Sequence, residues 1–333
     1  MNYNIPKPYL TIRKVLNIKL LQLSYLLSSK LKRPIIWGNP TTLDIEPINL
    51  CNLKCSECAL GNGQITRKKG HIDFELYKNI IDETNRDLLT LSLFFQGEPY
   101  MNGNIFKMIQ YADSKLVYTY ISTNGHFLDN ENAKSTVESG LKKLIISLDG
   151  VDEKTYRLYR KNGDFHKVMQ GIKNVIRWKI KLQMQYPEVV IRFLVFKYNE
   201  HQIPEIYKIG KELGVEKVVI KTAQIYNYQN KQHIIPSHDE YSRYKIIDSG
   251  QVKIKSQHPN KCYRMWESSV ITIEGDVVPC CFDKNSNNKL GNLYNQSFHE
   301  IWRSKRYGQF RRKIFSKRNK VDICANCSEG ITY

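Results

Sequence analysis

Eight cysteines are the side chains of this sequence best suited to chemistry, and they fall into two widely separated groups. Cys51, Cys55 and Cys58 lie close together near the start of the chain. The second group consists of Cys262, Cys280, Cys281, Cys324 and Cys327. Clustered cysteines in a chain with no secretion signal favour metal binding over disulfides. Both groups are therefore candidate metal sites.

The first group has three cysteines where closed metal sites usually have four. Structural zinc prefers four ligands, and four cysteines are usual for iron–sulfur cubanes. Short spacing lets Cys51, Cys55 and Cys58 wrap one compact cluster at a low cost in loop entropy. Two interpretations remain: His71 completes a zinc site, or the fourth coordination position is open to something other than protein.

The elements that must position these cysteines alternate between strand and helix. Apolar, β-branched or aromatic runs predict strands at 43–48, 91–95, 117–121, 144–148, 189–196 and 217–222. Helices are expected at 73–88, 103–114, 129–139, 152–160, 164–181 and 199–213. Six βα units are two short of an eightfold barrel, so the expected fold is α/β, a partial (β/α)6 TIM-like barrel. The first cysteine group follows the first strand, at the rim where barrel active sites form.

The loop Cys51-x3-Cys55-x2-Cys58 in this position resembles the signature of the radical SAM superfamily, and the resemblance covers about residues 43–330. It implies that the three cysteines hold a 4Fe–4S cluster whose free iron binds the amino and carboxylate groups of S-adenosylmethionine. It also implies one-electron cleavage to a 5′-deoxyadenosyl radical, with the hard chemistry supplied by the cofactor.

Two motifs after the second and third strands agree with this family. Gln96-Gly97-Glu98-Pro99 resembles the Gly-Gly-Glu-Pro motif, which implies that Gly97 and Glu98 receive the methionyl ammonium. Gln96 departs from that motif and leaves the local backbone turn open. The resemblance also implies that Asn124, within Ser122-Thr123-Asn124-Gly125, faces the cofactor.

The segment after the fourth strand resembles the family as well, with one departure elsewhere. Ser147 and Arg160 are implied to meet the cofactor carboxylate, for which an Arg fork suits the geometry. Arg157 is near enough in sequence to be confused with Arg160. Glu57 stands where the family usually has an aromatic residue near the adenine, so stacking there is lost.

The second cysteine group resembles the SPASM/twitch extension of radical SAM enzymes. The matching features are Gly275, the segment 290–293 and the ligand set Cys262, Cys280, Cys324 and Cys327. Four cysteines imply one auxiliary 4Fe–4S cluster with no open position. Cys281 is an alternative to Cys280, although the Gly-x4-Cys spacing favours Cys280. Structural zinc fits four cysteines equally well by spacing alone.

The net charge of +19 is concentrated at the two ends of the chain. Residues 1–43 carry seven Lys or Arg and no acid, and residues 301–321 carry nine and no acid. An N-terminal helix with apolar residues at 12, 16, 20, 23, 27 and 31 is expected, either packed on the domain or lying on a membrane surface. The predicted parts are 1–42 (basic helix and lead-in), 43–225 (core), 226–261 (connection) and 262–333 (auxiliary iron–sulfur domain).

These features predict a radical SAM enzyme with one auxiliary cluster that oxidises or otherwise modifies a small molecule or carbohydrate. Peptide maturation and RNA modification are alternatives, and a zinc-stabilised nucleic-acid-binding protein is the rival from another class. The expected partners are the unidentified substrate and an electron donor such as flavodoxin or ferredoxin; nucleic acid is not expected. No charge-free run approaches the ~20 residues of a spanning helix, so the expected location is the cytoplasm, with peripheral membrane contact left open.

Overall fold

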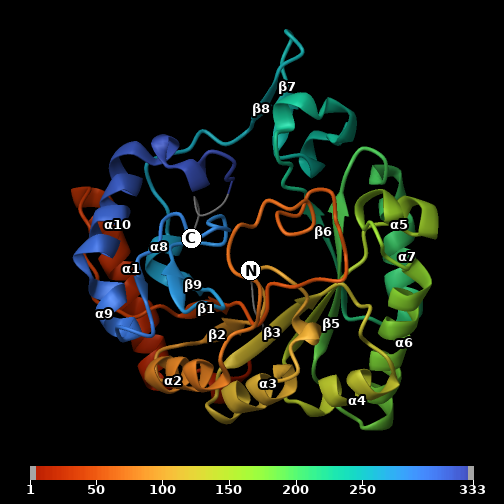
Figure 1. The fold of residues 1–333 in the computed structure, drawn as a ribbon, viewed down its shortest axis with the longest axis horizontal. Helices are drawn as coiled ribbons and strands as arrows, with labels where there is room; N and C mark the ends of the chain where they lie inside the picture. Colours follow the sequence, from red (N-terminus) through yellow and green to blue (C-terminus); the bar gives the residue numbers. More distant parts are fainter. Residues whose placement is uncertain (1–4, 329–333) are drawn as a thin grey trace.

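The computed structural model describes residues 5–328 and is built around one nine-stranded sheet. The strand order is β11-β10-β9-β1-β2-β3-β4-β5-β6 (Figure 1). The central six are β1 (Thr42–Ile45), β2 (Thr90–Ser92), β3 (Tyr118–Thr123), β4 (Lys143–Ser147), β5 (Glu188–Val195) and β6 (Lys217–Thr222). All neighbours among these six are parallel. The predicted α/β partial barrel is confirmed.

Helices cover the outer side of these strands and leave the inner side to the loops. They are α2 (Phe74–Thr84), α3 (Ile105–Ser114), α4 (Asn130–Glu138), α5 (Glu153–Tyr159), α6 (Phe165–Lys181) and α7 (Ile203–Leu213). In Figure 1 they follow an arc, and the orange segment after β1 lies inside it. Four of them begin at an aspartate whose carboxylate accepts a backbone N–H of the first turn, namely Asp73, Asp129, Asp152 and Asp164.

The C-terminal region continues the same sheet beyond β1. Strand β9 (Ser268–Ile271) pairs in parallel with β1, and β10 (Asp276–Val278) and β11 (Gly291–Asn292) add antiparallel strands. The apolar residues 270–273 and 277–278 on either side of Gly275 predict a short hairpin, which the structure confirms; Gly275 has the positive φ of +73° that such a turn favours in glycine. The sequence also predicts one helix at 297–312, but the structure has two, α9 (Phe298–Arg303) and α10 (Lys305–Lys317). They break at Ser304, whose side chain caps α10.

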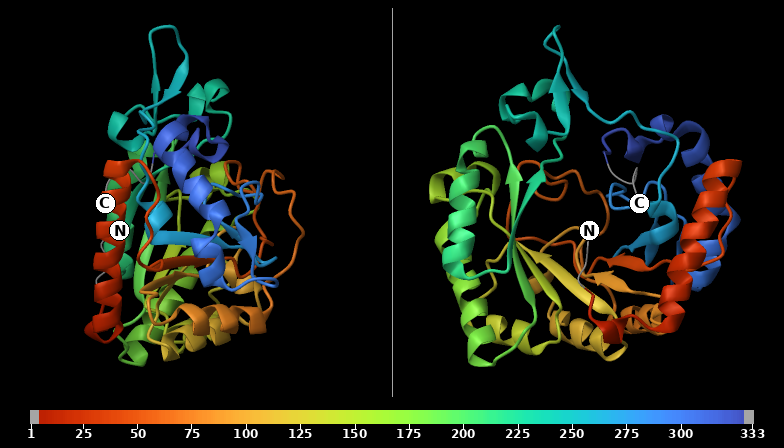
Figure 2. Two further views of the ribbon diagram at one scale, coloured as in Figure 1. Left: turned by 90° about the vertical axis from the view of Figure 1, so that its left-hand side faces the viewer. Right: turned by 180° about the vertical axis from the view of Figure 1, so that it is seen from behind.

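The polar segment between β6 and the short helix α8 (Arg264–Glu267) is more structured than its composition predicts. It contains three turns of 3₁₀-helix, at Tyr228–Asn230, Gln232–Ile234 and Asp239–Tyr241. A two-stranded hairpin of β7 (Tyr244–Ile246) and β8 (Val252–Ile254) follows and projects away from the body of the molecule (Figures 1 and 2).

The N-terminal helix α1 (Ile12–Leu31) packs on the body, but not through its predicted apolar stripe. Its inward face carries Lys14, Asn17, Leu21, Ser24, Tyr25 and Ser28. The amide of Asn17 exchanges two hydrogen bonds of 2.8 Å with the backbone of Asn39. The stripe residues remain outside, and Ile12 is 82% exposed. In the part of the chain described here, α1 included, no helix is long and apolar enough to cross a membrane.

Folding brings the two basic ends of the sequence to one flank. Helices α1 and α10 lie on the same side of the molecule in Figure 1, and α1 contacts the short helix α8. The arc of α4, α6 and α7 lies on the opposite flank. The two basic segments of the sequence therefore lie on one side of the molecule rather than forming two separate tails.

Candidate active site

One cavity of about 140 Å³ at the carboxyl ends of the first strands gathers every residue that the sequence placed around the first cluster and its cofactor. These lining residues are Cys51, Cys55, Cys58, Gly97, Glu98, Asn124, Ser147 and Arg160. They come from the carboxyl ends of β1, β2, β3 and β4 and from the segments that follow, and these ends share one edge because the strands are parallel. His71 does not line the cavity; it forms an isolated bridge with Ile48.

The cysteine loop is held by its backbone, which leaves its thiols to face the cavity. Lys54 N–H donates to Lys161 O at 3.0 Å, and Cys58 N–H donates to Cys55 O at 3.2 Å. Burial raises the pKa of the Cys51 thiol to about 12 and also raises the pKa of Cys55. Buried thiols of this kind are weak nucleophiles and become thiolates when a metal replaces the proton.

Gly97 and Glu98 form a tight turn against the loop after β1. Gly97 has φ of +79°, and a Cβ there would lie 2.3 Å from the carbonyl oxygen of Ile48. Glu98 N–H donates to Leu50 O at 2.8 Å, which sets the turn in place. The turn therefore requires a glycine at 97 but not at 96, where the Gln96 side chain is buried. This explains why the turn survives the departure at Gln96.

The Glu98 carboxylate is fully buried among donors from the loop after β3. Thr123 Oγ1 donates to it at 2.6 Å and Asn124 N–H at 2.8 Å. Burial raises the pKa of Glu98 to about 7, and these donors oppose part of that rise. Such a carboxylate is suited to receive an ammonium group, which would supply the missing countercharge.

Asn124 connects this carboxylate to the cysteine loop. Its side-chain amide donates to Asn52 Oδ1 at 2.8 Å and lies 3.8 Å from Cys51 Sγ. Its side-chain Oδ1 accepts the backbone N–H of His126 at 3.0 Å, and His126 Nε2 accepts the backbone N–H of Asp164 at 2.8 Å. Asn124 is therefore fixed in position from both sides.

Arg160 enters the cavity from the end of α5, and Asp149 orients it. Arg160 Nε donates to Asp149 Oδ2 at 2.6 Å, while Nη1 lies 3.6 Å from Cys55 Sγ. The guanidinium also lies over the Tyr159 ring, 4.8 Å from its centroid. Arg157 points elsewhere, being 58% exposed and paired with Glu153. The geometry thus separates the two arginines, and it adds Asp149, which the sequence analysis did not name as a site residue.

Glu57 has a structural role that its departure from the family pattern did not predict. Its carboxylate is almost fully buried and accepts the Tyr226 N–H at 2.9 Å and the Lys231 ammonium at 2.5 Å. These bonds join the cysteine loop to the segment that follows β6. At the position where the family usually has an aromatic residue, this chain therefore has a carboxylate that forms an ion pair with Lys231.

A second, smaller cavity of about 20 Å³ is lined by all four cysteines of the predicted auxiliary set, Cys262, Cys280, Cys324 and Cys327. Cys281 does not line it; its Sγ lies 3.5 Å from Arg264 Nη1. Arg318, which the sequence analysis missed within a basic run, also lines this cavity. It donates from Nη2 to Cys327 Sγ at 3.5 Å and from Nη1 to Lys261 O at 2.7 Å.

A buried ion pair ties the segment after the first cysteines to the C-terminal region. Arg67, from the loop after the first cysteines, makes a bidentate contact with Glu46 at 2.8 and 2.7 Å. Its Nε donates to Lys284 O at 2.8 Å, and Glu46 also accepts the Ile273 N–H at 3.1 Å. The cysteine loop, β1 and the C-terminal region therefore meet at one guanidinium.

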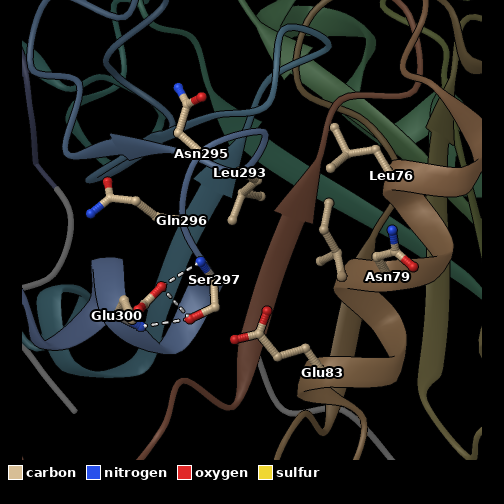
Figure 3. A pocket seen from close by; sticks show the side chains of 9 residues that line it. Leu76, Asn79, Glu83, Leu293, Asn295, Gln296, Ser297 and Glu300 are labelled. Atoms are coloured by element: carbon tan, nitrogen blue, oxygen red, sulfur yellow. Dashed lines mark hydrogen bonds between the residues drawn. The ribbon is translucent and has the colours of Figure 1, made fainter.

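A wider cavity of about 350 Å³ lies away from both cysteine groups, between α2 and the segment before α9 (Figure 3). Its polar groups are engaged in hydrogen bonds that cap and anchor α9. Glu83 accepts the backbone N–H groups of Phe298 and His299 at 2.9 and 2.8 Å, and Ser297 and Glu300 cap α9 reciprocally. It is a junction between two helices, and nothing in it resembles the cysteine sites.

The donor sets fit the groups that the sequence implies. Three thiols, a buried carboxylate and a guanidinium around one cavity suit a cluster with an open iron and a ligand bearing an ammonium and a carboxylate. Among residues 5–328, no group of three or more His, Cys, Asp or Glu side chains is arranged so that it could hold a single metal ion. The fold and these cavities define an iron–sulfur enzyme of the α/β partial-barrel class.

Comparison with known proteins agrees with this class. Residues 45–209 match the Radical SAM superfamily model, and residues 262–328 match SPASM, an iron–sulfur cluster-binding domain. The chain belongs to the radical SAM superfamily and carries a C-terminal SPASM domain.

Its relatives differ in what they act on. An Fe-coproporphyrin III synthase of Methanosarcina barkeri is 30% identical over 190 residues, which cover 57% of this chain but only 44% of that protein. A tungsten-containing aldehyde ferredoxin oxidoreductase cofactor-modifying protein of Pyrococcus furiosus is 24% identical over 86% of both chains. The fold is similar to Streptococcus suis SuiB bound to S-adenosylmethionine, with a TM-score of 0.66 and 18% identity over 92% of this chain and 74% of that one.

Proposed function

We propose that this radical SAM enzyme reductively cleaves S-adenosylmethionine and uses one auxiliary 4Fe–4S cluster in the net oxidation or modification of a small molecule or carbohydrate. The observation that carries the proposal is the convergence of Cys51, Cys55 and Cys58 with Glu98 and Arg160 on one cavity. When bound, the cluster and the cofactor supply one-electron cleavage of the sulfonium and hydrogen abstraction from the substrate.

The residues of the chain hold the two ends of the cofactor's methionyl group. Glu98 faces the ammonium, and its own backbone and Asn124 keep it in place. Arg160, braced by Asp149, offers a guanidinium to the carboxylate, and the hydroxyl of Ser147 lies on the same wall. In this proposal the cofactor would bind the iron that the three cysteines leave open.

The proposed auxiliary cluster is bound by Cys262, Cys280, Cys324 and Cys327, which line a single cavity. Four thiolates fill the coordination of a cubane, so this cluster would have no open iron. It would accept the electron left on the substrate after hydrogen abstraction. The electron that starts the reaction would come from a donor such as flavodoxin or ferredoxin.

The small-molecule class is supported by the names of two relatives, one a porphyrin synthase and the other a cofactor-modifying protein. Peptide and RNA are the alternative substrates, and the test compares how each class stimulates S-adenosylmethionine turnover. Stimulation of S-adenosylmethionine turnover by a small-molecule extract supports the proposal, whereas stimulation only by peptide or RNA would overturn this part of it.

Iron analysis tests the cluster assignments. The anaerobically purified protein should contain about eight irons and eight sulfides per chain and form 5′-deoxyadenosine after reduction. Replacing Cys51, Cys55 and Cys58 together by Ala should leave about four irons and no 5′-deoxyadenosine. A colourless zinc protein that forms none would overturn the proposed chemistry.

A further inference from the structure

The outward face of α1 is mostly apolar, and no other described part of the chain covers it. Its exposed apolar residues are Ile12, Val15, Leu16, Leu20, Leu23, Leu26 and Leu31. At 3.6 residues per turn, these positions fall on one side of the helix. A contiguous exposed apolar face of this kind marks an interaction surface.

The helix cannot hide this face by turning over, because its polar face is bonded to the body. Lys14 Nζ donates to Leu116 O at 2.5 Å. Ser28 Oγ donates to Ile35 O at 3.0 Å and accepts the Ile35 N–H at 2.8 Å. Arg13, at the edge, makes a bidentate contact with Asp87. Rotation would bury leucines only by leaving these polar groups without partners.

The charge around the face selects one kind of occupant. Residues 1–43 contain no Asp or Glu, while Lys19 and Lys30 lie on the outward face among the leucines. Helix α10, which lies on the same side of the molecule in Figure 1, adds exposed basic residues such as Lys305, Arg306 and Arg312. An apolar stripe with interspersed lysines and a basic flank matches an interfacial helix on an anionic bilayer.

A second copy of this chain fits less well. If two α1 helices packed face to face, the charged side chains brought together would all be basic, and no acid before Asp44 could offset their repulsion. Lysine stems, in contrast, can extend along a bilayer surface while the ammonium groups stay at the headgroups.

We propose that α1 docks this enzyme on an anionic lipid surface, with the leucine face in the headgroup–acyl boundary and Lys19, Lys30 and the α10 flank at the lipid phosphates. The side view in Figure 2 supports this orientation, because α1 forms one outer edge of the molecule there. The cysteine loop lies away from that edge, so docking leaves the site accessible.

Sedimentation with lipid vesicles tests the proposal on the full chain, reconstituted anaerobically. The protein should bind vesicles of phosphatidylcholine with phosphatidylserine and bind pure phosphatidylcholine weakly. Added salt should reduce this binding. The triple variant Leu16→Gln, Leu23→Gln and Leu26→Gln should lower the partition coefficient at least about tenfold. The pair Lys19→Gln and Lys30→Gln should weaken binding to anionic vesicles only.

A matched control uses three exposed apolar residues on the opposite flank: Ile180→Gln, Met184→Gln and Tyr207→Gln. This variant should bind as the parent does, and circular dichroism and cluster absorbance should show that every variant is folded. Equal binding by the parent and the α1 triple variant would overturn the proposal, as would no preference for anionic vesicles. A dimer that the α1 triple variant abolishes, without vesicle binding, would assign the face to a second copy instead.

Discussion

The guanidinium of Arg160 is held between the carboxylate of Asp149 and the thiol of Cys55, at 2.6 and 3.6 Å. Asp149 is itself fully buried and accepts the Leu194 N–H at 2.7 Å. The arginine that faces the cofactor site is therefore oriented by an ion pair anchored on β5. A cofactor carboxylate would meet a donor whose position is already set, at a small cost in side-chain entropy.

Asp149→Asn should weaken S-adenosylmethionine binding about tenfold, because the amide loses the charge that orients Arg160 and has one acceptor oxygen where Arg160 Nε and the Leu194 N–H need two. Equilibrium dialysis of the reconstituted protein measures this. Arg160→Lys should lose at least as much, since lysine cannot reproduce the fork. Arg157→Lys, at an exposed position, is the control and should bind normally. Equal affinity in all three variants would rule out the assigned role of Arg160.

The affinity for S-adenosylmethionine should depend on pH through Glu98. Burial raises the pKa of this carboxyl to about 7, so it is mostly protonated and neutral at pH 6 and ionised at pH 8. Because an ammonium ligand prefers the ionised form, affinity should rise as the pH increases through about 7. Glu98→Gln should bind weakly at every pH and lose this dependence. A flat profile in the parent protein would contradict the role of Glu98.

Gly97→Ala should destabilise the fold by at least about 2 kcal/mol, because a methyl group would meet two backbone carbonyl oxygens at a positive φ. Chemical denaturation of the cluster-free protein gives this value. Gly103→Ala is the matched control, because a Cβ there meets nothing within 4 Å. Its free energy of unfolding should stay within about 0.5 kcal/mol of the parent value. Similar losses at both positions would show that the strain at Gly97 is not the cause.

Cys280→Ala should remove the auxiliary cluster, whereas Cys281→Ala should retain it, since only Cys280 lines the cavity. Iron content separates the two variants, because the first should lose about four irons per chain and the second none. The opposite pattern would reassign the fourth ligand.

Breaking the tie between Glu57 and Lys231 should loosen the segment after β6. Glu57→Gln keeps an acceptor for the Tyr226 N–H but removes the charge that the lysine faces. Limited proteolysis should cut residues 223–260 faster in this variant. Lys245→Met, which removes an exposed lysine in the same segment, serves as the control and should leave the cutting rate unchanged.

Local chemistry made much of this molecule predictable from its sequence. Asp73, Asp129, Asp152 and Asp164 mark helix starts because a carboxylate satisfies the free N–H groups of the first turn. The cysteine loop and the polar motifs meet because each follows a parallel strand, and parallel strands end at a common edge.

What the sequence did not predict depends on partners that are distant along the chain. The polar face of α1 turns inward because Asn39 and Leu116 offer it hydrogen bonds, which outweigh the periodicity of its leucines. Glu57 is bonded to Lys231 rather than stacked on a ligand. For the neighbours Cys280 and Cys281, the spacing from Gly275 favours Cys280, and the turn after β10 places Cys280 but not Cys281 at the cavity.

The parallel pairing of β9 with β1 determines when the support of the first cysteine loop can form during synthesis on the ribosome. The edge of β1 on that side has no strand to pair with until Ser268–Ile271 has been synthesised. An unpaired strand edge is a template for misassociation. The loop that carries the first cysteines follows directly from this strand, so its final support arrives late in translation. Assembly of the first metal centre is therefore expected to be posttranslational, and a chain truncated before β9 should not retain its iron.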